Sequence, residues 1–264
     1  MTENSLIFLK LGGSLITDKN QAETVREGIL HNCLAQVKRW LQEYPNAGLV
    51  LGHGSGSFGH HAAKTYHTRD GVSTKQDWLG YSEVWYSARK LNNMVIDACV
   101  SAGIPVVDFP ISAGVVTENR LVQSFNLDPL KEALIQGLVP IVHGDVCIDR
   151  SLGGTILSTE EIFNYLASHF KPNRILLAGV EGGVYADYPS NQQLIPHIPV
   201  DVYLSNFLQG SEAKDVTGGM ATKVTLMQEI AHKYPGTEII IFSGLVDNSI
   251  YRVLNGEALG TCIV

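Results

Sequence analysis

Short apolar runs and longer amphipathic stretches alternate along the chain. The short runs are rich in Val, Ile and Leu and predict buried strands at residues 6–11, 49–51, 104–109, 139–143, 175–178 and 238–242. The stretches between them predict helices at residues 24–43, 81–102, 129–136, 160–170, 220–232 and 248–254. This alternation predicts an α/β fold with a mainly parallel sheet covered by helices on both faces. In such sheets ligands bind at the carboxyl ends of the strands.

The chain has neither an internal repeat nor a low-complexity linker. A turn at residues 171–173 separates an N-terminal half, about residues 1–170, from a C-terminal half, about residues 171–264. Residues 185–199 contain three prolines and several polar side chains, which predicts a hairpin or a loop excursion. We expect the two halves to form one domain spanning residues 1–264.

Composition narrows the class of protein. The 264 residues are 45% hydrophobic, which is enough for one large core, and the net charge of −7 without a basic cluster argues against nucleic-acid binding. No apolar run approaches the length of a membrane span, and the first residues lack the basic start of a signal peptide. We expect a cytoplasmic protein with reduced thiols, because the cysteines are widely spaced and form no zinc pattern. They are Cys33, Cys99, Cys147 and Cys262.

The segment 52–60, with the sequence GHGSGSFGH, joins a predicted strand to a predicted helix. A glycine-rich turn in that position exposes backbone N–H groups at a helix N-terminus, where anions and phosphate groups bind. His60 ends the segment and can donate a hydrogen bond to phosphate. The alternative is an ordinary glycine turn with a capping histidine. We favour phosphate binding, and we expect His53 and His61 to be structural or exposed.

Two further glycine corners carry lysines. Lys10 lies within the first apolar run, directly before a Gly-Gly-Ser turn, and Lys19 follows that turn. A lysine in such a run needs a partner, and a phosphoryl group would be one, whereas Lys19 alone could be a solvated turn residue. Near the C-terminus, segment 215–220 opens a helix that contains Lys223, a pattern that suits a polyphosphate.

A fourth corner follows the strand at residues 139–143. Asp145 there could orient a lysine, hold a hydroxyl group or metal-bound water, or simply cap the next turn, and the residues leave these readings open. Gly154, just downstream, could approach a ligand. The chain contains no G-x-x-x-x-G-K-[ST] loop, nucleophile elbow or protein-kinase signature, so phosphate chemistry would need another scaffold.

Together these motifs resemble the amino acid kinase superfamily. The resemblance rests on segments 10–14, 144–145, 182–185 and 215–220 with Lys223, and it extends in order over nearly the whole chain. The G-x-G-S-F-G-H sequence ending at His60 further resembles the isopentenyl phosphate kinases, although fosfomycin kinases share a similar histidine. The resemblance implies a three-layer αβα sandwich and transfer of the γ-phosphoryl group of ATP, bound with Mg²⁺, to isopentenyl phosphate. It also implies a homodimer with a small-molecule substrate and no membrane partner.

The resemblance assigns roles to individual residues. It implies that Lys10 and Lys19 stabilise the transferring group, that His60 holds the acceptor phosphate, and that Asp145 organises the lysines. The implied ATP-binding residues are Lys10, Gly12, Gly13, Ser14, Ser55, Gly182, Gly219 and Lys223. The implied acceptor-binding residues are Gly54, Gly59, His60 and Gly154, with Val84, Ala88 and Leu91 beside the prenyl tail. No side chain is assigned as a metal ligand.

Two segments depart from the family pattern. Residues 158–161 read STEE where many members read SGDD, and residues 178–182 read AGVEG where TDVDG is usual. The alternatives to an isopentenyl phosphate kinase are a kinase of the same fold for another phosphate or phosphonate, similar to fosfomycin kinases, and a non-catalytic nucleotide-binding protein. An apolar pocket would favour a five-carbon tail, and the retained lysines and His60 argue against lost catalysis.

Overall fold

The computed structural model describes residues 5–202 and 220–264, apart from the side chains of residues 60–62 and 64. Its largest sheet has the strand order β12-β14-β13-β9-β1-β2-β6-β3. Every neighbouring pair in that sheet is parallel except β13 and β14. The strands are β1 (Leu6–Leu11), β2 (Gly48–His53), β3 (Val106–Asp108), β6 (Val139–His143), β9 (Arg174–Gly179), β12 (His197–Ile198), β13 (Glu238–Ser243) and β14 (Thr261–Ile263).

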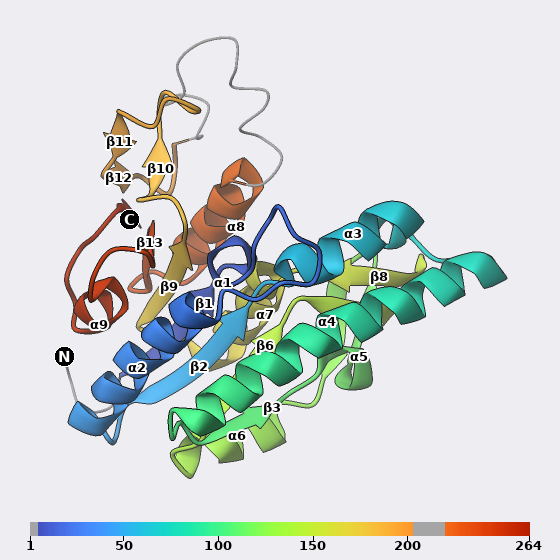
Figure 1. Ribbon diagram of the computed structural model, residues 1–264, viewed down its shortest axis with the longest axis horizontal. Helices are drawn as coiled ribbons and strands as arrows, with labels where there is room; N and C mark the ends of the chain where they lie inside the picture. Colours follow the sequence, from blue (N-terminus) through green and yellow to red (C-terminus); the bar gives the residue numbers. More distant parts are fainter. Residues whose placement is uncertain (1–4, 203–219) are drawn as a thin grey trace.

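Helices cover both faces of this sheet (Figure 1). They are α1 (Gly13–Ile16), α2 (Glu27–Glu43), α3 (Gly56–Tyr66), α4 (Lys75–Ser101), α5 (Ile111–Gly114), α6 (Asp128–Ile135), α7 (Thr159–Phe170), α8 (Met220–Lys233) and α9 (Ser249–Leu254). Within the part of the chain that the structure describes, none of these helices is long and apolar enough to cross a membrane.

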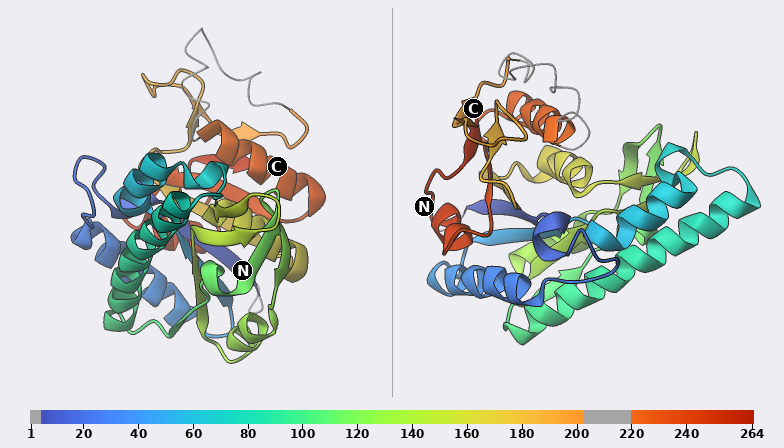
Figure 2. Two further views of the ribbon diagram at one scale, coloured as in Figure 1. Left: turned by 90° about the vertical axis from the view of Figure 1, so that its right-hand side faces the viewer. Right: turned by 45° about the horizontal axis from the view of Figure 1, so that its top comes forward.

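Alternation along the central strands produces two cores, because successive side chains of a strand point to opposite faces. In β1, Ile7, Leu9 and Leu11 join the cluster shared with α2, α4 and α9, whereas Phe8 joins the cluster shared with α6, α7 and α8. The molecule is therefore a three-layer αβα sandwich (Figure 2). Lys10 has the same parity as Phe8, so its side chain points toward the layer that contains α7 and α8.

The predicted strands and helices of the main sheet are confirmed, with boundaries shifted by a few residues. The expected excursion at 185–199 contains the hairpin of β10 (Val184–Tyr185) and β11 (Leu194–Ile195). The sequence did not predict a second, four-stranded sheet with the order β5-β4-β7-β8. Its strands are β4 (Val115–Glu118), β5 (Leu121–Phe125), β7 (Asp145–Asp149) and β8 (Gly153–Leu157).

The two halves of the chain share the main sheet. Strands β1, β2, β3 and β6 come from the first half and β9, β12, β13 and β14 from the second, and the halves meet where β1 pairs with β9. The four cysteines are buried and unpaired, as expected for reduced core thiols.

Candidate active site

Two glycine turns meet at the carboxyl edge of the sheet, one after β1 and one after β2. A Cβ atom on Gly13 would lie 2.4 Å from the Gly56 nitrogen, and a Cβ atom on Gly54 would lie 2.9 Å from the Gly13 nitrogen. Gly56 also has a φ of +51°, which favours glycine. The glycine content of segment 52–60 thus has a packing cause besides any phosphate, since only glycines allow these two backbones to approach so closely.

A buried threonine fastens the two turns to each other. The Thr17 hydroxyl donates to the Gly13 carbonyl at 2.7 Å and accepts from the Ser57 N–H at 2.9 Å. Next to them, the His53 carbonyl accepts from the Thr159 hydroxyl at 2.6 Å, and the Gly12 N–H donates to the Ala178 carbonyl at 2.8 Å. These bonds hold the ends of β1, β2 and β9 and the start of α7 in fixed positions around one point.

Lys10 projects to this point from the end of β1. Its ammonium lies 2.5 Å from a carboxylate oxygen of Glu160, and both side chains are about nine-tenths buried. Burial alone would raise the pKa of Glu160, but the positive charges of Lys10 and Lys223 outweigh it and lower that pKa below its usual value. Glu160 is therefore a buried carboxylate that holds its negative charge between two lysines.

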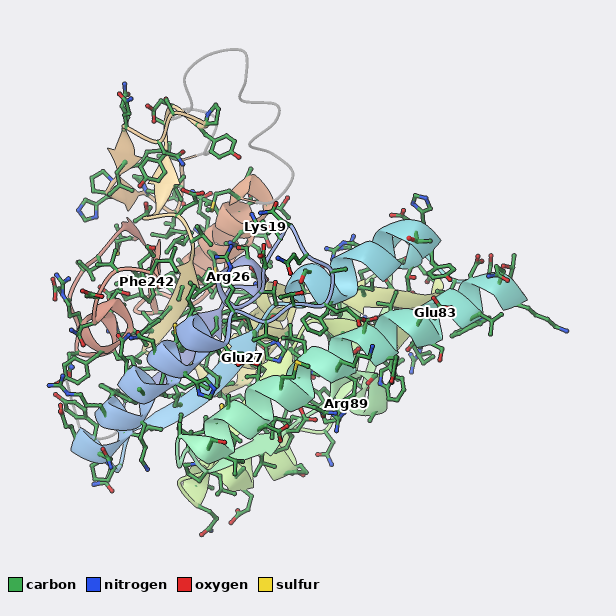
Figure 3. All side chains as sticks on the ribbon, in the orientation of Figure 1. Lys19, Arg26, Glu27, Glu83, Arg89 and Phe242 are labelled. Carbon is green, nitrogen blue, oxygen red and sulfur yellow. The ribbon has the colours of Figure 1, made fainter. Side chains whose placement is uncertain are left out.

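Lys223 and Lys19 complete a cluster of positive charge with Lys10. Burial and the neighbouring Lys10 lower the pKa of Lys223, and Glu160 opposes that shift. Lys19 also contributes to it, and Figure 3 shows Lys19 on the loop between α1 and α2, beside α8. Lys10 and Lys223 thus share one carboxylate while the charge of Lys19 also acts on Lys223, so the site carries an excess positive charge that a polyphosphate would neutralise.

The neighbouring acid, Glu161, makes different contacts. The Ser158 hydroxyl accepts from the Glu161 N–H, and the Glu161 carboxylate accepts from the Ser158 N–H, so α7 begins with a capping box. The same carboxylate lies 3.3 Å from Arg69 and 2.7 Å from Arg120. Glu161 therefore caps α7 and pairs with two arginines, whereas Glu160 pairs with Lys10.

Asp145 does not meet the lysines in the way that the resemblance implied. Among the contacts of the described residues, its carboxylate accepts from the Val146 N–H at 2.8 Å, approaches His143 Nε2 at 3.7 Å and bonds with Ser112. Glu160, and not Asp145, pairs with Lys10. The sequence carried one signal for this: Glu160 stands at the start of a helix that follows a strand ending at the site.

A buried polar cluster surrounds Asp145. His53 Nε2 donates to Asn92 Oδ1 at 3.0 Å, and the His53 ring stacks on His143 with ring centroids 5.2 Å apart. Burial lowers the pKa of both imidazoles and raises the pKa of Asp145 to about 6. His53 is thus a buried structural histidine, as expected, and the cluster supports the base of the glycine turn.

Residues that were expected to bind the acceptor lie beyond this cluster, between α4 and the four-stranded sheet. Gly154 faces Tyr81, whose ring carbons would come within 2.9 Å of a Cβ atom on the glycine. A cavity of about 380 Å³ opens beside Tyr81, and its lining residues are Tyr81, Ser82, Trp85, Ser112 and Ala113.

The three residues expected beside the prenyl tail are all buried. Val84 is 3%, Ala88 2% and Leu91 0% exposed, and none of them lines the cavity. Leu91 belongs to the core cluster between α4, α2 and the sheet, so its assignment to the tail pocket is wrong. The cavity instead uses the adjacent stripe of α4, because the strictly apolar stripe is the one that packs against the sheet.

The structure describes some of the remaining predicted site residues but not all of them. Ser14 lies in α1, Ser55 is the N-cap of α3, and Gly59 packs against the Ser55 side chain. Gly182, which was expected to bind the nucleotide, packs against the Tyr185 hydroxyl. The His60 side chain and Gly219 lie outside the described residues. Among those described, no group of three His, Cys, Asp or Glu side chains is placed to hold a metal ion.

This fold, with clustered lysines and interlocked glycine turns at the strand ends, defines a phosphate-transferring α/β protein. The model of the amino acid kinase family matches residues 5–243, and the chain belongs to this family.

The chain is also similar to individual proteins of one kind within this family. The chain is 35% identical to isopentenyl phosphate kinase of Methanocaldococcus jannaschii over 97% of both proteins, and 30% identical to that of Methanothermobacter thermautotrophicus over 96% of both. Among solved structures, one of isopentenyl phosphate kinase superimposes with a TM-score of 0.83 at 28% identity, covering 98% of this chain and 100% of the other.

Proposed function

We propose that this protein transfers the γ-phosphoryl group of ATP to isopentenyl phosphate and forms isopentenyl diphosphate and ADP. The observation that carries the proposal is the convergence of Lys10 and Lys223 on Glu160, with Lys19 close enough to act on Lys223, beside two glycine turns. The similar relatives named isopentenyl phosphate kinase support the choice of acceptor. In this assignment one glycine turn serves ATP and the other serves the acceptor.

On the ATP side, the N–H groups of Gly13 and Ser14 would bind phosphate oxygens at the start of α1, beside Gly12, whose own N–H donates to the Ala178 carbonyl. Lys10 and Lys19 would stabilise the transferring phosphoryl group, Lys223 would lie at the nucleotide, and Glu160 would keep Lys10 in place. Mg²⁺ enters with ATP as part of the substrate and would reduce the charge on its phosphates. The other residues assigned to the nucleotide are Ser55, Gly182 and Gly219.

On the acceptor side, His60 and the N–H groups of the α3 turn would hold the phosphate monoester. A phosphate monoester has a second pKa of about 6, so its oxygen is a nucleophile near neutral pH without a strong general base. The remaining task is to bring two anions into line, which lysines, N–H groups and a histidine achieve by position and charge. We place the prenyl tail in the cavity between Tyr81 and Ser112.

Kinetics of His60 variants test this assignment. We expect His60→Ala to lower kcat/KM for isopentenyl phosphate about 100-fold and His60→Gln about 10-fold, because the amide keeps a donor to phosphate. His31→Ala, an exposed histidine on α2, is the matched control. If both His60 variants turn over like the parent protein, the role of His60 is refuted.

An acceptor panel separates the alternatives. ADP release would be measured with isopentenyl phosphate, dimethylallyl phosphate and fosfomycin. We expect turnover with the prenyl phosphates; turnover with fosfomycin alone would favour a phosphonate kinase, and no ADP with any acceptor would favour a non-catalytic nucleotide-binding protein.

We also propose that the two halves act as a single domain, that the protein forms a homodimer and that it is cytoplasmic. The sheet shared by both halves supports the single domain, and the free thiols support the cytoplasmic location.

The homodimer has a candidate surface. Exposed apolar side chains on α4, including Leu79, Tyr86 and Met94, offer a surface that a second copy could cover. Light scattering of the purified protein would measure twice the mass of one chain.

A further inference from the structure

The loop between α1 and α2 carries Lys19, and its base is firmly closed. Thr17 and Val25 form a backbone bridge, and the Asp18 N–H donates to the Thr24 carbonyl at 2.9 Å. This fixes where the loop begins and ends. The closed base alone does not determine the orientation of the rest of the loop, on which Lys19 is an exposed residue (Figure 3).

One side chain of the loop reaches across to a distant helix. The Glu23 carboxylate accepts from the Ser87 hydroxyl at 3.1 Å and lies 2.8 Å from the Lys90 ammonium, and both partners are on α4. Glu23 also has a φ of +48°, a conformation that costs free energy for a residue other than glycine. The contacts to α4 offset that cost and give the loop a defined orientation.

We propose that Glu23 is a positioning residue for Lys19. By tying the loop to α4, it holds the Lys19 ammonium where the transferring phosphoryl group passes. Lys19 has no acidic partner among the described residues, so nothing in its own ion pairs holds it there. The inference rests on the proposed function, in which Lys19 stabilises the transferring group.

The contact between Glu23 and α4 also connects the cavity assigned to the acceptor with the loop that carries Lys19. The turn of α4 that precedes Ser87 carries Trp85, which lines the cavity assigned to the acceptor tail. Through Glu23, the helix that contacts the acceptor therefore also orients the lysine of the phosphoryl-transfer site. Since both members of the ion pair are more than a third exposed, the effect on rate is moderate and weakens with salt.

Charge reversal tests the proposed role of the Glu23–Lys90 ion pair. We expect Glu23→Lys to lower kcat about fivefold and Lys90→Glu to do the same, with both KM values within about twofold, because Lys19 acts mainly in the transition state. The double reversal restores most of kcat. In a Lys19→Met background, Glu23→Lys has no further effect. Glu257→Lys breaks the exposed pair with Arg252 on another helix and is the matched control.

Hydrogen exchange of the ligand-free protein gives a second readout that needs no activity. Glu23→Lys should speed amide exchange in residues 18–25, whereas Glu257→Lys leaves them unchanged. An unchanged kcat and exchange rate, or a loss of kcat that persists without Lys19, overturns the proposal. If the parent protein releases no ADP with any acceptor, the proposed function fails, and the exchange rates alone then decide whether Glu23 orients the loop.

Discussion

Neighbouring glutamates at the start of α7 illustrate how a shift of one position gives identical side chains different contacts. Glu160 faces the sheet and pairs with Lys10 in a buried environment, whereas Glu161 faces two arginines and caps its own helix. At position 160, where the family pattern has aspartate, the glutamate side chain reaches Lys10. Residue type alone could not distinguish these two acids.

We expect Glu160→Gln to lower kcat about 100-fold, because Lys10 would lose the charge that fixes its ammonium and a small displacement of a reacting group is costly. The measurement is steady-state ADP release at saturating substrates, with circular dichroism to verify folding. Glu160→Asp should retain more activity than Glu160→Gln, since it keeps the charge.

Glu161→Gln is the matched control for this prediction. It would weaken the pairs with Arg69 and Arg120 and lower the free energy of unfolding by about 1 kcal/mol, with kcat within about twofold of the parent. Equal losses of kcat in the two variants would contradict the separation of roles.

At the scale of elements, one buried carboxylate joins the turns of the four-stranded sheet. Asp149 is 1% exposed and ends β7. Its oxygens accept hydrogen bonds from the Thr117 hydroxyl and from the backbone N–H groups of Asn119, Arg120, Ser151 and Leu152. Burial would raise the pKa of Asp149, but these donors outweigh it and lower that pKa to about 2.

We expect Asp149→Ala to lower the free energy of unfolding at pH 7 by about 3 kcal/mol, because it leaves several N–H groups in two turns without an acceptor. The contribution of Asp149 is complete above its usual pKa of 3.8 and is lost as the pH falls through about 2. Urea unfolding at pH 7, 4 and 2.5 should therefore show the variant approaching the parent only at the lowest pH. Thr117→Val, which removes a single donor, should cost about 1 kcal/mol; a comparable loss in both variants would refute the role of Asp149.

The sequence predicted the strands of the main sheet except β12 and β14, but none of the smaller sheet, for a physical reason. Strands such as β1 and β6 are buried on both faces and read as continuous apolar runs. Strand β5 lies at the edge of its sheet with Leu121 exposed, and β8 begins with Gly153, so neither shows a clear period. The glycine corners were predictable from their composition, whereas the Lys10–Glu160 pair depends on which strand and helix become neighbours.

At the scale of the whole molecule, the lysines of the site repel one another in the ligand-free protein. Lys10 and Lys223 converge on Glu160, and the lowered pKa of Lys223 reflects burial and the repulsion by Lys10, with a further contribution from Lys19. The two halves of the sheet meet between β1 and β9, so this repulsion acts where the halves join. Binding of a polyphosphate there should therefore stabilise the entire fold, and removing one lysine should do so without ligand.

We expect Lys223→Met to raise the free energy of unfolding of the ligand-free protein by about 1 kcal/mol, because it removes a desolvated and repelled charge. The parent should gain about 2.7 kcal/mol from a non-hydrolysable ATP analogue with Mg²⁺ at 100 times its Kd, and at that same concentration the variant should gain far less. Thermal unfolding with and without the analogue measures both effects. Lys233→Met changes an exposed lysine in the last turn of the same helix and should bring no gain, since a cation there is favourable. A ligand-free Lys223→Met protein that is less stable than the parent would show that the lysine cluster is held together by contacts stronger than its mutual repulsion.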